Sequence, residues 1–307
     1  MRNQNDAKYV LAAFGPLCLL LSGLVIHYRG LLKELQENVY PPRLVIQSFK
    51  ERDIEFTTNF YGLRYSGEST NLIDLNILYF GAFEKPLLMF LKDVAGAIRD
   101  EPIIFVDVGA NTGQHTIFAS RFSRQVHAFE PFPTILERLH AAVDMNSLTN
   151  VTIHPIGLGA SESLLDFREP PKSNHGLGSF VANFAPSLGD VIQLRVVNGD
   201  SYFRETGITA VDLIKIDVEG YEQPVLKGLR TTMESTRPVA VMALTVGRDV
   251  EDLFTSEQQL RDALPSGYVL ELLQNTGSAM LSGEYVINPF QVDFSLNSQF
   301  TVIAYPD

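Results

Sequence analysis

The chain has 307 residues, 45% of them hydrophobic, and a formal net charge of −12 at pH 7. This length and apolar content provide for a sizeable core and exclude wholesale disorder. The sequence has no cluster of basic residues, which binding to a phosphate backbone requires, so nucleic acid is not expected as a partner.

The most apolar segment, residues 10–26, has no charged side chain and holds the only cysteine, Cys18, which excludes an intrachain disulfide. As a helix it would rise about 26 Å, slightly less than the hydrocarbon thickness of a bilayer. Tyr9 and Tyr28 flank it as interfacial aromatic residues do, so the segment predicts a single membrane anchor. A cleaved signal peptide and a buried helix stay open as alternatives. Basic residues lie on both sides, so the side of the membrane stays undetermined.

For residues 29–100 we predict a stalk, followed by a lead-in segment that packs on the main domain. Residues 54–69 alternate apolar and polar side chains around turn residues, which predicts a hairpin. Residues 71–98 carry apolar residues at helical spacing, interrupted at Gly81 and Pro86. We expect this lead-in to cover the active site.

From residue 101 to 307, short apolar runs alternate with helical patterns, which favours an α/β domain with a parallel sheet covered by helices on both faces. The predicted strands are Ile103–Val108, Gln125–Glu130, Val151–Ile156, Val211–Val218, Val239–Leu244, Val269–Leu273 and Phe300–Tyr305. The predicted helices are Thr112–Phe122, Thr134–Asn146, Glu222–Met233 and Ser256–Ala263.

Ligands of such sheets bind at the carboxyl ends of the strands. Four segments should converge there: Asp107–Gly113, Glu130, Ile156–Gly159 and Asp217–Glu219. The first is a glycine-containing turn between a strand and a helix, which would place bare backbone N–H groups and the positive end of a helix beside one ligand.

The residues of this turn restrict the ligand. A dinucleotide turn would carry glycines where this sequence has Asn111 and Gln114, so NAD is disfavoured. No Walker-type G-K-[ST] sequence follows. An acidic residue, Glu130, stands at the end of the next strand, where a carboxylate can accept both hydroxyls of a ribose.

The turn and Glu130 together resemble the nucleoside-binding half of S-adenosylmethionine-dependent methyltransferases. Four stretches in order, "FVDVGANTGQHT", "HAFEP", "NVTIHPIGLG" and "VDLIKIDVEGYEQPVLKGL", resemble the FkbM family of these enzymes. The resemblance implies a Rossmann-like class I methyltransferase sheet, mostly parallel, with the last strand antiparallel. It also implies S-adenosyl-L-methionine as the cofactor and methyl transfer to a hydroxyl of a glycan or small molecule.

The resemblance also implies which residues bind the cofactor. Asp107 would order the turn and face the methionine end, Glu130 would bind the ribose, and Ile156-Gly157-Leu158 would lie against adenine. The implied cofactor-binding residues are Asp107, Gly109, Ala110, Asn111, Gly113, Glu130, Gly157 and Leu158. One departure concerns the acceptor side: family members commonly carry a Glu near the end of the fifth strand, where this sequence has Leu244-Thr245.

Methyl transfer needs an aligned acceptor and a route for its proton. Asp217 and Glu219 stand two apart at a strand end and should point to the same side. Asp217 is expected close to the methyl group, and Glu219 could orient or deprotonate the acceptor hydroxyl. Alternatively, the two acids cap the following helix. The sequence offers no further ligand cluster, so no metal is expected.

Several other polar residues are explained equally well by a role in the site and by a structural or surface role. His175 lies in a glycine-bearing loop and is the third catalytic candidate, and His115 in the first helical turn can face the ligand. A structural role explains each histidine equally well. Asn174 and Ser179 are candidate acceptor contacts, whereas Glu84 is equally well explained as a surface residue.

These observations favour a single-pass membrane-anchored O-methyltransferase with three parts: residues 1–28, 29–100 and 101–307. A non-catalytic nucleoside-binding scaffold of methyltransferase fold is the first alternative. An NAD-dependent oxidoreductase is the second. The sequence does not identify the acceptor.

Overall fold

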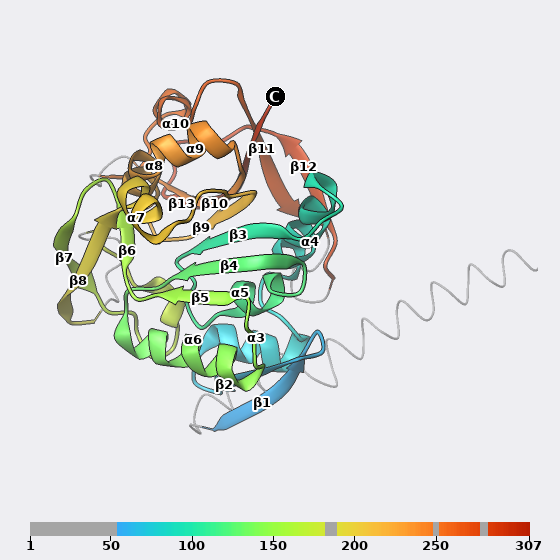
Figure 1. Cartoon of the computed structure of the whole chain (residues 1–307). Coiled ribbons are helices and arrows are strands. Elements are labelled where there is room, and N and C mark those ends of the chain that lie inside the picture. Colours follow the sequence, from blue (N-terminus) through green and yellow to red (C-terminus); the bar gives the residue numbers. More distant parts are fainter. Residues whose placement is uncertain (1–53, 182–188, 248–251, 277–281) are drawn as a thin grey trace, which may run out of the picture. The chain divides into compact units, whose positions relative to one another are not determined.

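The computed structural model of this chain describes residues 54–181, 189–247, 252–276 and 282–307, all within one compact unit, Ile54–Asp307 (Figure 1). The predicted membrane anchor, residues 10–26, lies outside the described residues. Among the residues described, no helix has the length and apolar character needed to cross a bilayer. The boundaries at residues 28 and 100 stay predictions.

Within the described residues, an eight-stranded sheet has the order β12-β11-β13-β10-β9-β3-β4-β5. Its strands are β3 (Ile103–Val108), β4 (Ser123–Phe129), β5 (Val151–His154), β9 (Leu213–Ile216), β10 (Val239–Val246), β11 (Tyr268–Asn275), β12 (Tyr285–Pro289) and β13 (Ser298–Pro306). β3, β4, β5, β9 and β10 run parallel, whereas β13 is antiparallel to β10 and β11. The mostly parallel sheet with an antiparallel last strand is confirmed.

Helices cover both faces of this sheet. Alternate residues of a strand point to opposite faces, so each face packs against its own helices. On β3, Phe105 belongs to a cluster with Leu91 of α4, whereas Val106 belongs to a cluster on the other face with Leu226 of α8. The helices are α3 (Leu72–Phe80), α4 (Lys85–Ile98), α5 (Gln114–Ala119), α6 (Pro133–Met145), α7 (Gly199–Thr206), α8 (Glu222–Gly228), α9 (Arg230–Thr236) and α10 (Glu257–Ala263).

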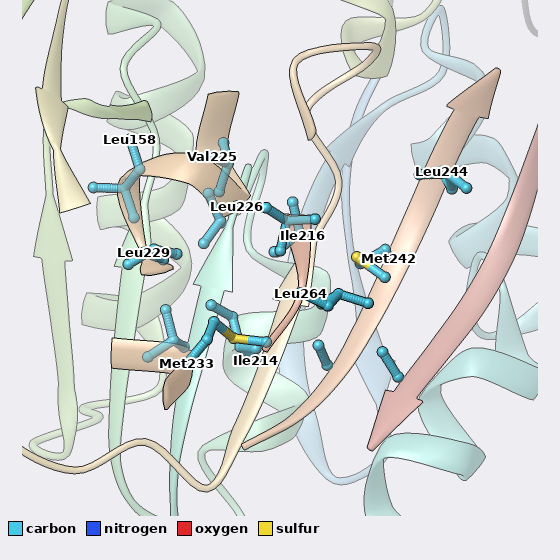
Figure 2. Packing of buried hydrophobic residues seen from close by; sticks show 14 of the residues in the cluster. Leu158, Ile214, Ile216, Val225, Leu226, Leu229, Met233, Met242, Leu244 and Leu264 are labelled. Atoms are coloured by element: carbon cyan, nitrogen blue, oxygen red, sulfur yellow. The ribbon is translucent and has the colours of Figure 1, made fainter. Parts of the chain in front are cut away.

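The larger hydrophobic cluster fixes α8 and α9 against β9 and β10. Figure 2 shows Ile214 and Ile216 of β9 beside Met242 of β10, with Leu226 and Leu229 nearby. All five side chains are at most 1% exposed. Removing each from water contributes about 1.5–3 kcal/mol, so this packing holds the end of β9 in place.

The lead-in forms the predicted hairpin, β1 (Glu55–Phe60) and β2 (Leu63–Glu68), followed by α3 and α4. Gly81 ends α3 at a φ of 84°, as expected for a C-terminal glycine cap. Pro86 does not interrupt the second helix. It lies in the first turn of α4, where a missing N–H costs no hydrogen bond.

The lead-in packs on the main domain. Phe60 and Tyr65 of the hairpin region and Leu88 of α4 share a buried cluster with Ile117 and Phe118 of the α5 helix. The helix that follows the glycine turn is therefore held from one side by the sheet and from the other by the lead-in.

A small sheet was not predicted. Strands β6 (Gly157–Gly159), β8 (Val191–Asn198) and β7 (Ser163–Arg168) pair in that order. β7 exposes every second residue over part of its length, including Leu164, so the continuous apolar runs that marked the central strands are absent from it. The predicted helix 222–233 was also wrong, since it is two helices, α8 and α9.

Leu229 lies between those two helices and is fully buried. We expect Leu229→Ala to lower the free energy of unfolding by about 2–5 kcal/mol, because the truncation leaves a cavity. Urea unfolding followed by circular dichroism measures this loss. Leu164→Ala, at a side chain that is 64% exposed, is the control and should change stability by less than about 0.5 kcal/mol. Equal effects of the two substitutions would contradict this packing.

Candidate active site

A buried ion pair joins the ends of β3 and β9. Asp107 and Lys215 are register partners on these neighbouring strands, and Lys215 Nζ lies 3.2 Å from Asp107 Oδ1. The same ammonium lies 3.5 Å from Asp217 Oδ2 and donates to the Gly109 carbonyl at 3.4 Å. Burial alone would lower the pKa of Lys215, but Asp107, Asp217 and Glu84 raise it above its usual value. Lys215 therefore stays charged.

The glycine turn lies directly against the end of β9. Gly109 has a φ of 77°, and a Cβ atom there would lie 1.9 Å from the Asp217 carbonyl oxygen. Only glycine fits this position, both because of its backbone angle and because of this close approach. At Gly113, whose φ is 91°, a Cβ atom would lie 2.6 Å from Leu139.

The expectation that this turn offers bare N–H groups is wrong. Gly109 and Ala110 both donate to the Phe129 carbonyl at 3.0 Å, and Gly113 donates to the Ala110 carbonyl. Thr112 donates to the Asn111 side chain at 2.7 Å. Backbone donors in a tight turn are satisfied within the protein when they are not solvated, so the turn supplies shape and close approach rather than donors.

Glu130 directly follows β4, and its side chain lies against the turn. Its two oxygens accept hydrogen bonds from the N–H groups of Asn111 and Phe132, each at 2.9 Å. Burial raises the pKa of Glu130 to about 7, while these two backbone donors oppose the rise. A carboxylate held in this way keeps lone pairs for two further donors, such as the hydroxyls of a ribose.

A cavity of about 260 Å³ lies over these strand ends. Seven of the predicted site residues line it: Gly109, Ala110, Asn111, Glu130, His175, Asp217 and Glu219. Four predicted cofactor residues do not: Asp107, Gly113, Gly157 and Leu158. Asp107 is fully buried, with Oδ1 bound to Lys215 and Oδ2 to Thr116, so it orders the turn without facing the cavity.

The two residues predicted beside adenine lie elsewhere. Leu158 is 2% exposed and packs in the large core cluster, and Gly157 pairs with Val196 in the small sheet. The apolar part of the cavity lining includes instead Phe132, Ile135, Phe167 and Phe180, which pack together in one cluster. These four residues were not predicted, because the segments they come from share no sequence pattern.

Besides Glu130, three acidic residues line the cavity: Asp217, Glu219 and Glu84. Burial, Asp217 and Glu222 raise the pKa of Glu219 to about 9, so this carboxyl is protonated at neutral pH. Neither Asp217 nor Glu219 caps the next helix, because the capping position of α8 is Tyr221 and no side chain there bonds to the helix N-terminus. The capping explanation of the two acids is therefore wrong.

Two histidines, His115 and His175, line the cavity. His115 of α5 is 7% exposed, and its Nε2 lies 3.8 Å from Glu84 Oε2. Burial and Lys215 lower the pKa of His115 well below its usual value. His175 Nδ1 lies 3.0 Å from Arg138, and burial together with this guanidinium lowers its pKa as well. Both imidazoles are therefore neutral at pH 7.

The loop that carries His175 is held by its own polar groups. Asn174 Oδ1 accepts from the Gly176 N–H at 3.1 Å, and both residues line the cavity. Ser179 does not line it, and its hydroxyl donates to the Glu219 carbonyl at 2.6 Å. Ser179 therefore links this loop to the segment after β9.

A buried network connects the lead-in to the cavity. The Tyr65 hydroxyl donates to Asp74 at 2.7 Å and lies 2.8 Å from the Thr112 hydroxyl of the turn. Arg138 lies 2.7 Å from the same Asp74 carboxylate and touches His175. The lead-in thus holds both the turn and the His175 loop in place.

In the part of the chain that the structure describes, no group of three or more His, Cys, Asp or Glu side chains is arranged to hold a metal ion.

Lys215 was not predicted as a site residue, although the sequence indicates that it has a buried partner. A lysine inside the apolar run Leu213–Ile216 requires a buried partner, and the strand ends supply it.

Comparison with protein families shows that residues 107–264, just over half of the chain, match the methyltransferase FkbM domain. The chain belongs to the FkbM methyltransferase family. This membership places it among the S-adenosylmethionine-dependent methyltransferases, and S-adenosyl-L-methionine is the cofactor that it implies. Gly109 and Glu130 line the same cavity, and the Glu130 carboxylate, held by the N–H of Asn111, fits the ribose hydroxyls of that cofactor. Membership sets aside the NAD-dependent oxidoreductase.

Among curated relatives of this FkbM-family chain, the hexuronic acid methyltransferase AglP of Haloferax volcanii is 27% identical over 154 residues. The 31-O-demethyl-FK506 methyltransferase FkbM of Streptomyces tacrolimicus is 30% identical over 159 residues. The matches cover 50% and 43% of this chain and 61% of each relative, so they span about three fifths of the relatives' length. A solved FkbM methyltransferase from Methylobacillus flagellatus KT has 17% identity and a TM-score of 0.44, covering 89% of this chain and 61% of that chain.

The fit at Gly109 is directly testable. We expect Gly109→Ala to abolish binding of S-adenosylhomocysteine and to cost more than about 1 kcal/mol of stability, because the new Cβ meets the Asp217 carbonyl at an unfavourable φ. Isothermal titration calorimetry and thermal unfolding measure the two effects. Gly96→Ala is the control: it lies in α4 with open space around it, and should stabilise the helix by up to about 1 kcal/mol. Wild-type affinity in Gly109→Ala would exclude the turn from the binding site.

Proposed function

We propose that this protein is an O-methyltransferase that transfers a methyl group from S-adenosylmethionine to a hydroxyl of a glycan or small molecule. One observation carries the proposal: a single cavity joins the Gly109 turn and Glu130 to the acidic groups Glu84, Asp217 and Glu219. A nucleoside donor and an acceptor hydroxyl need these two kinds of lining side by side. The names of two relatives, one a hexuronic acid methyltransferase and the other a 31-O-demethyl-FK506 methyltransferase, support an acceptor of this class.

The donor supplies an activated methyl group. The protein therefore has to bind the donor, orient the acceptor hydroxyl and remove its proton. Ionised Glu130 accepts hydrogen bonds from the ribose hydroxyls. The apolar lining of Phe132, Phe167 and Phe180 receives the adenine in place of Gly157 and Leu158. Glu219, protonated at neutral pH, donates a hydrogen bond to the acceptor and orients it.

We further propose that residues 10–26 form a single-pass membrane anchor. The support is their length and their lack of charged side chains. The full chain should stay in the membrane fraction after a sodium carbonate wash, and a chain that begins at residue 29 should not. Release of the full chain by the wash would contradict the anchor.

Titration with S-adenosylhomocysteine tests the donor half of the function. Glu130→Ala should weaken the affinity at least tenfold, because each hydrogen bond to a charged group contributes about 1.5–3 kcal/mol. The wild-type affinity should rise between pH 6 and pH 8, since the pKa of Glu130 is about 7 and the ionised form accepts both hydroxyls. This rise should vanish in Glu130→Ala.

Glu137→Ala is the matched control, at an exposed position of α6 outside the cavity, and should bind as the wild type does. Unchanged affinity in Glu130→Ala would contradict the assignment. Transfer of labelled methyl groups into a lysate's glycan and small-molecule fractions separates an enzyme from a non-catalytic scaffold, which would bind the donor without turnover.

A further inference from the structure

Glu84 is the residue that immediately precedes α4, and it lies outside residues 107–264, the part that matches the family. Its φ of 50° is in the left-handed region, which a residue with a side chain rarely adopts. Strained backbone of this kind persists only where the surrounding structure over-determines it, and it concentrates at functional sites. The Glu84 side chain lines the cavity, so the explanation as a plain surface residue does not describe it.

His115 faces the same part of the cavity with an unused polar atom. His115 is only 7% exposed, and its Nε2 has no hydrogen-bond partner among the described residues. A buried polar atom without a partner is costly and rare in native structures. Because His115 lines the cavity, the unpartnered Nε2 indicates that a polar group of a ligand completes it.

The spacing of these two groups suits a single hydroxyl. His115 Nε2 and Glu84 Oε2 are 3.8 Å apart, too far for a direct hydrogen bond. One oxygen atom placed about 2.8 Å from each of them would make two good hydrogen bonds at once. The hydroxyl would donate to Glu84, and the neutral imidazole of His115 would donate to the hydroxyl oxygen.

The other acids of the cavity are less suited to accept a proton. One carboxylate oxygen of Asp217 lies beside the Lys215 ammonium, and the pKa of about 9 leaves Glu219 protonated at neutral pH. Burial and Asp217 raise the pKa of Glu84 to about 7, while Lys215 opposes the rise. The Glu84 side chain is 39% exposed, so solvent tempers this shift and a sizeable ionised fraction is present at neutral pH.

On the basis of the proposed function, we propose that Glu84 and His115 bind the acceptor hydroxyl and that Glu84 is the catalytic base. The acceptor oxygen bonds to the methyl carbon as the carbon–sulfur bond breaks, and that bonding pair stays on sulfur. The hydroxyl proton passes to the Glu84 carboxylate, which returns it to water. The lead-in thereby supplies a catalytic residue to a site whose donor half belongs to the family domain.

The test compares the full-length wild type, Glu84→Gln and Glu101→Gln. The control removes a carboxylate at an exposed position three residues after α4. Tritiated S-adenosylmethionine is supplied with methyl glucoside, methyl glucuronide and a lysate's glycan fraction. Binding of S-adenosylhomocysteine and the unfolding temperature are measured for each protein.

We expect Glu84→Gln to lower kcat by about 10²–10⁴-fold, the range for loss of a general base, and to bind S-adenosylhomocysteine within about twofold of the wild type. The wild-type kcat should rise with pH through about pH 7, as Glu84 ionises, and this limb should disappear in Glu84→Gln. Glu101→Gln should match the wild type throughout.

Each other outcome separates the two proposals. Full turnover in Glu84→Gln, or an unchanged pH limb, would overturn the role of Glu84 and leave the methyltransferase function standing. Loss of S-adenosylhomocysteine binding in Glu84→Gln at an unchanged unfolding temperature would also overturn it, because the residue would then belong to the donor side. If the wild type binds S-adenosylhomocysteine but methylates none of the acceptors, both the O-methyltransferase function and the role of Glu84 as the base are overturned.

Discussion

The ammonium of Lys215 is the interaction on which the site depends. It is 3% exposed, lies between Asp107 and Asp217, and also donates to the Gly109 carbonyl. One side chain thus joins two strands to the turn that receives the cofactor. Removal of one partner of a buried ion pair costs about 3–5 kcal/mol, because it leaves an uncompensated charge, so the pair also fixes the register of β3 against β9 at their functional ends.

Residues of both the lead-in and the family domain line the cavity beside this ion pair. The sheet contributes the Gly109 turn, Glu130 and Asp217, all at the carboxyl ends of parallel strands. The lead-in contributes Glu84 directly and braces the turn through Tyr65, whose hydroxyl lies against both Asp74 and Thr112. A cofactor turn held in this way needs little reorganisation when it binds a ligand.

The central sheet could be predicted because its strands are buried on both faces, and so Ile103–Val108 is apolar apart from Asp107. The turn could be predicted because Gly109 and Gly113 must adopt positive φ. The apolar side of the cavity could not, because Phe132 and Phe180 meet only through tertiary packing. The role of Glu84 could not be predicted for a similar reason, since nothing in its neighbourhood along the chain shows that it lies near Asp217 and Lys215.

A crystal structure of the full chain soaked with S-adenosylhomocysteine would show where the nucleoside binds. We expect the nucleoside to fill the cavity, with both ribose hydroxyls within hydrogen-bond distance of Glu130 and the sulfur on the side of Asp217 and Glu84. A nucleoside bound anywhere else, or a cavity that stays empty at saturating ligand, would contradict this expectation.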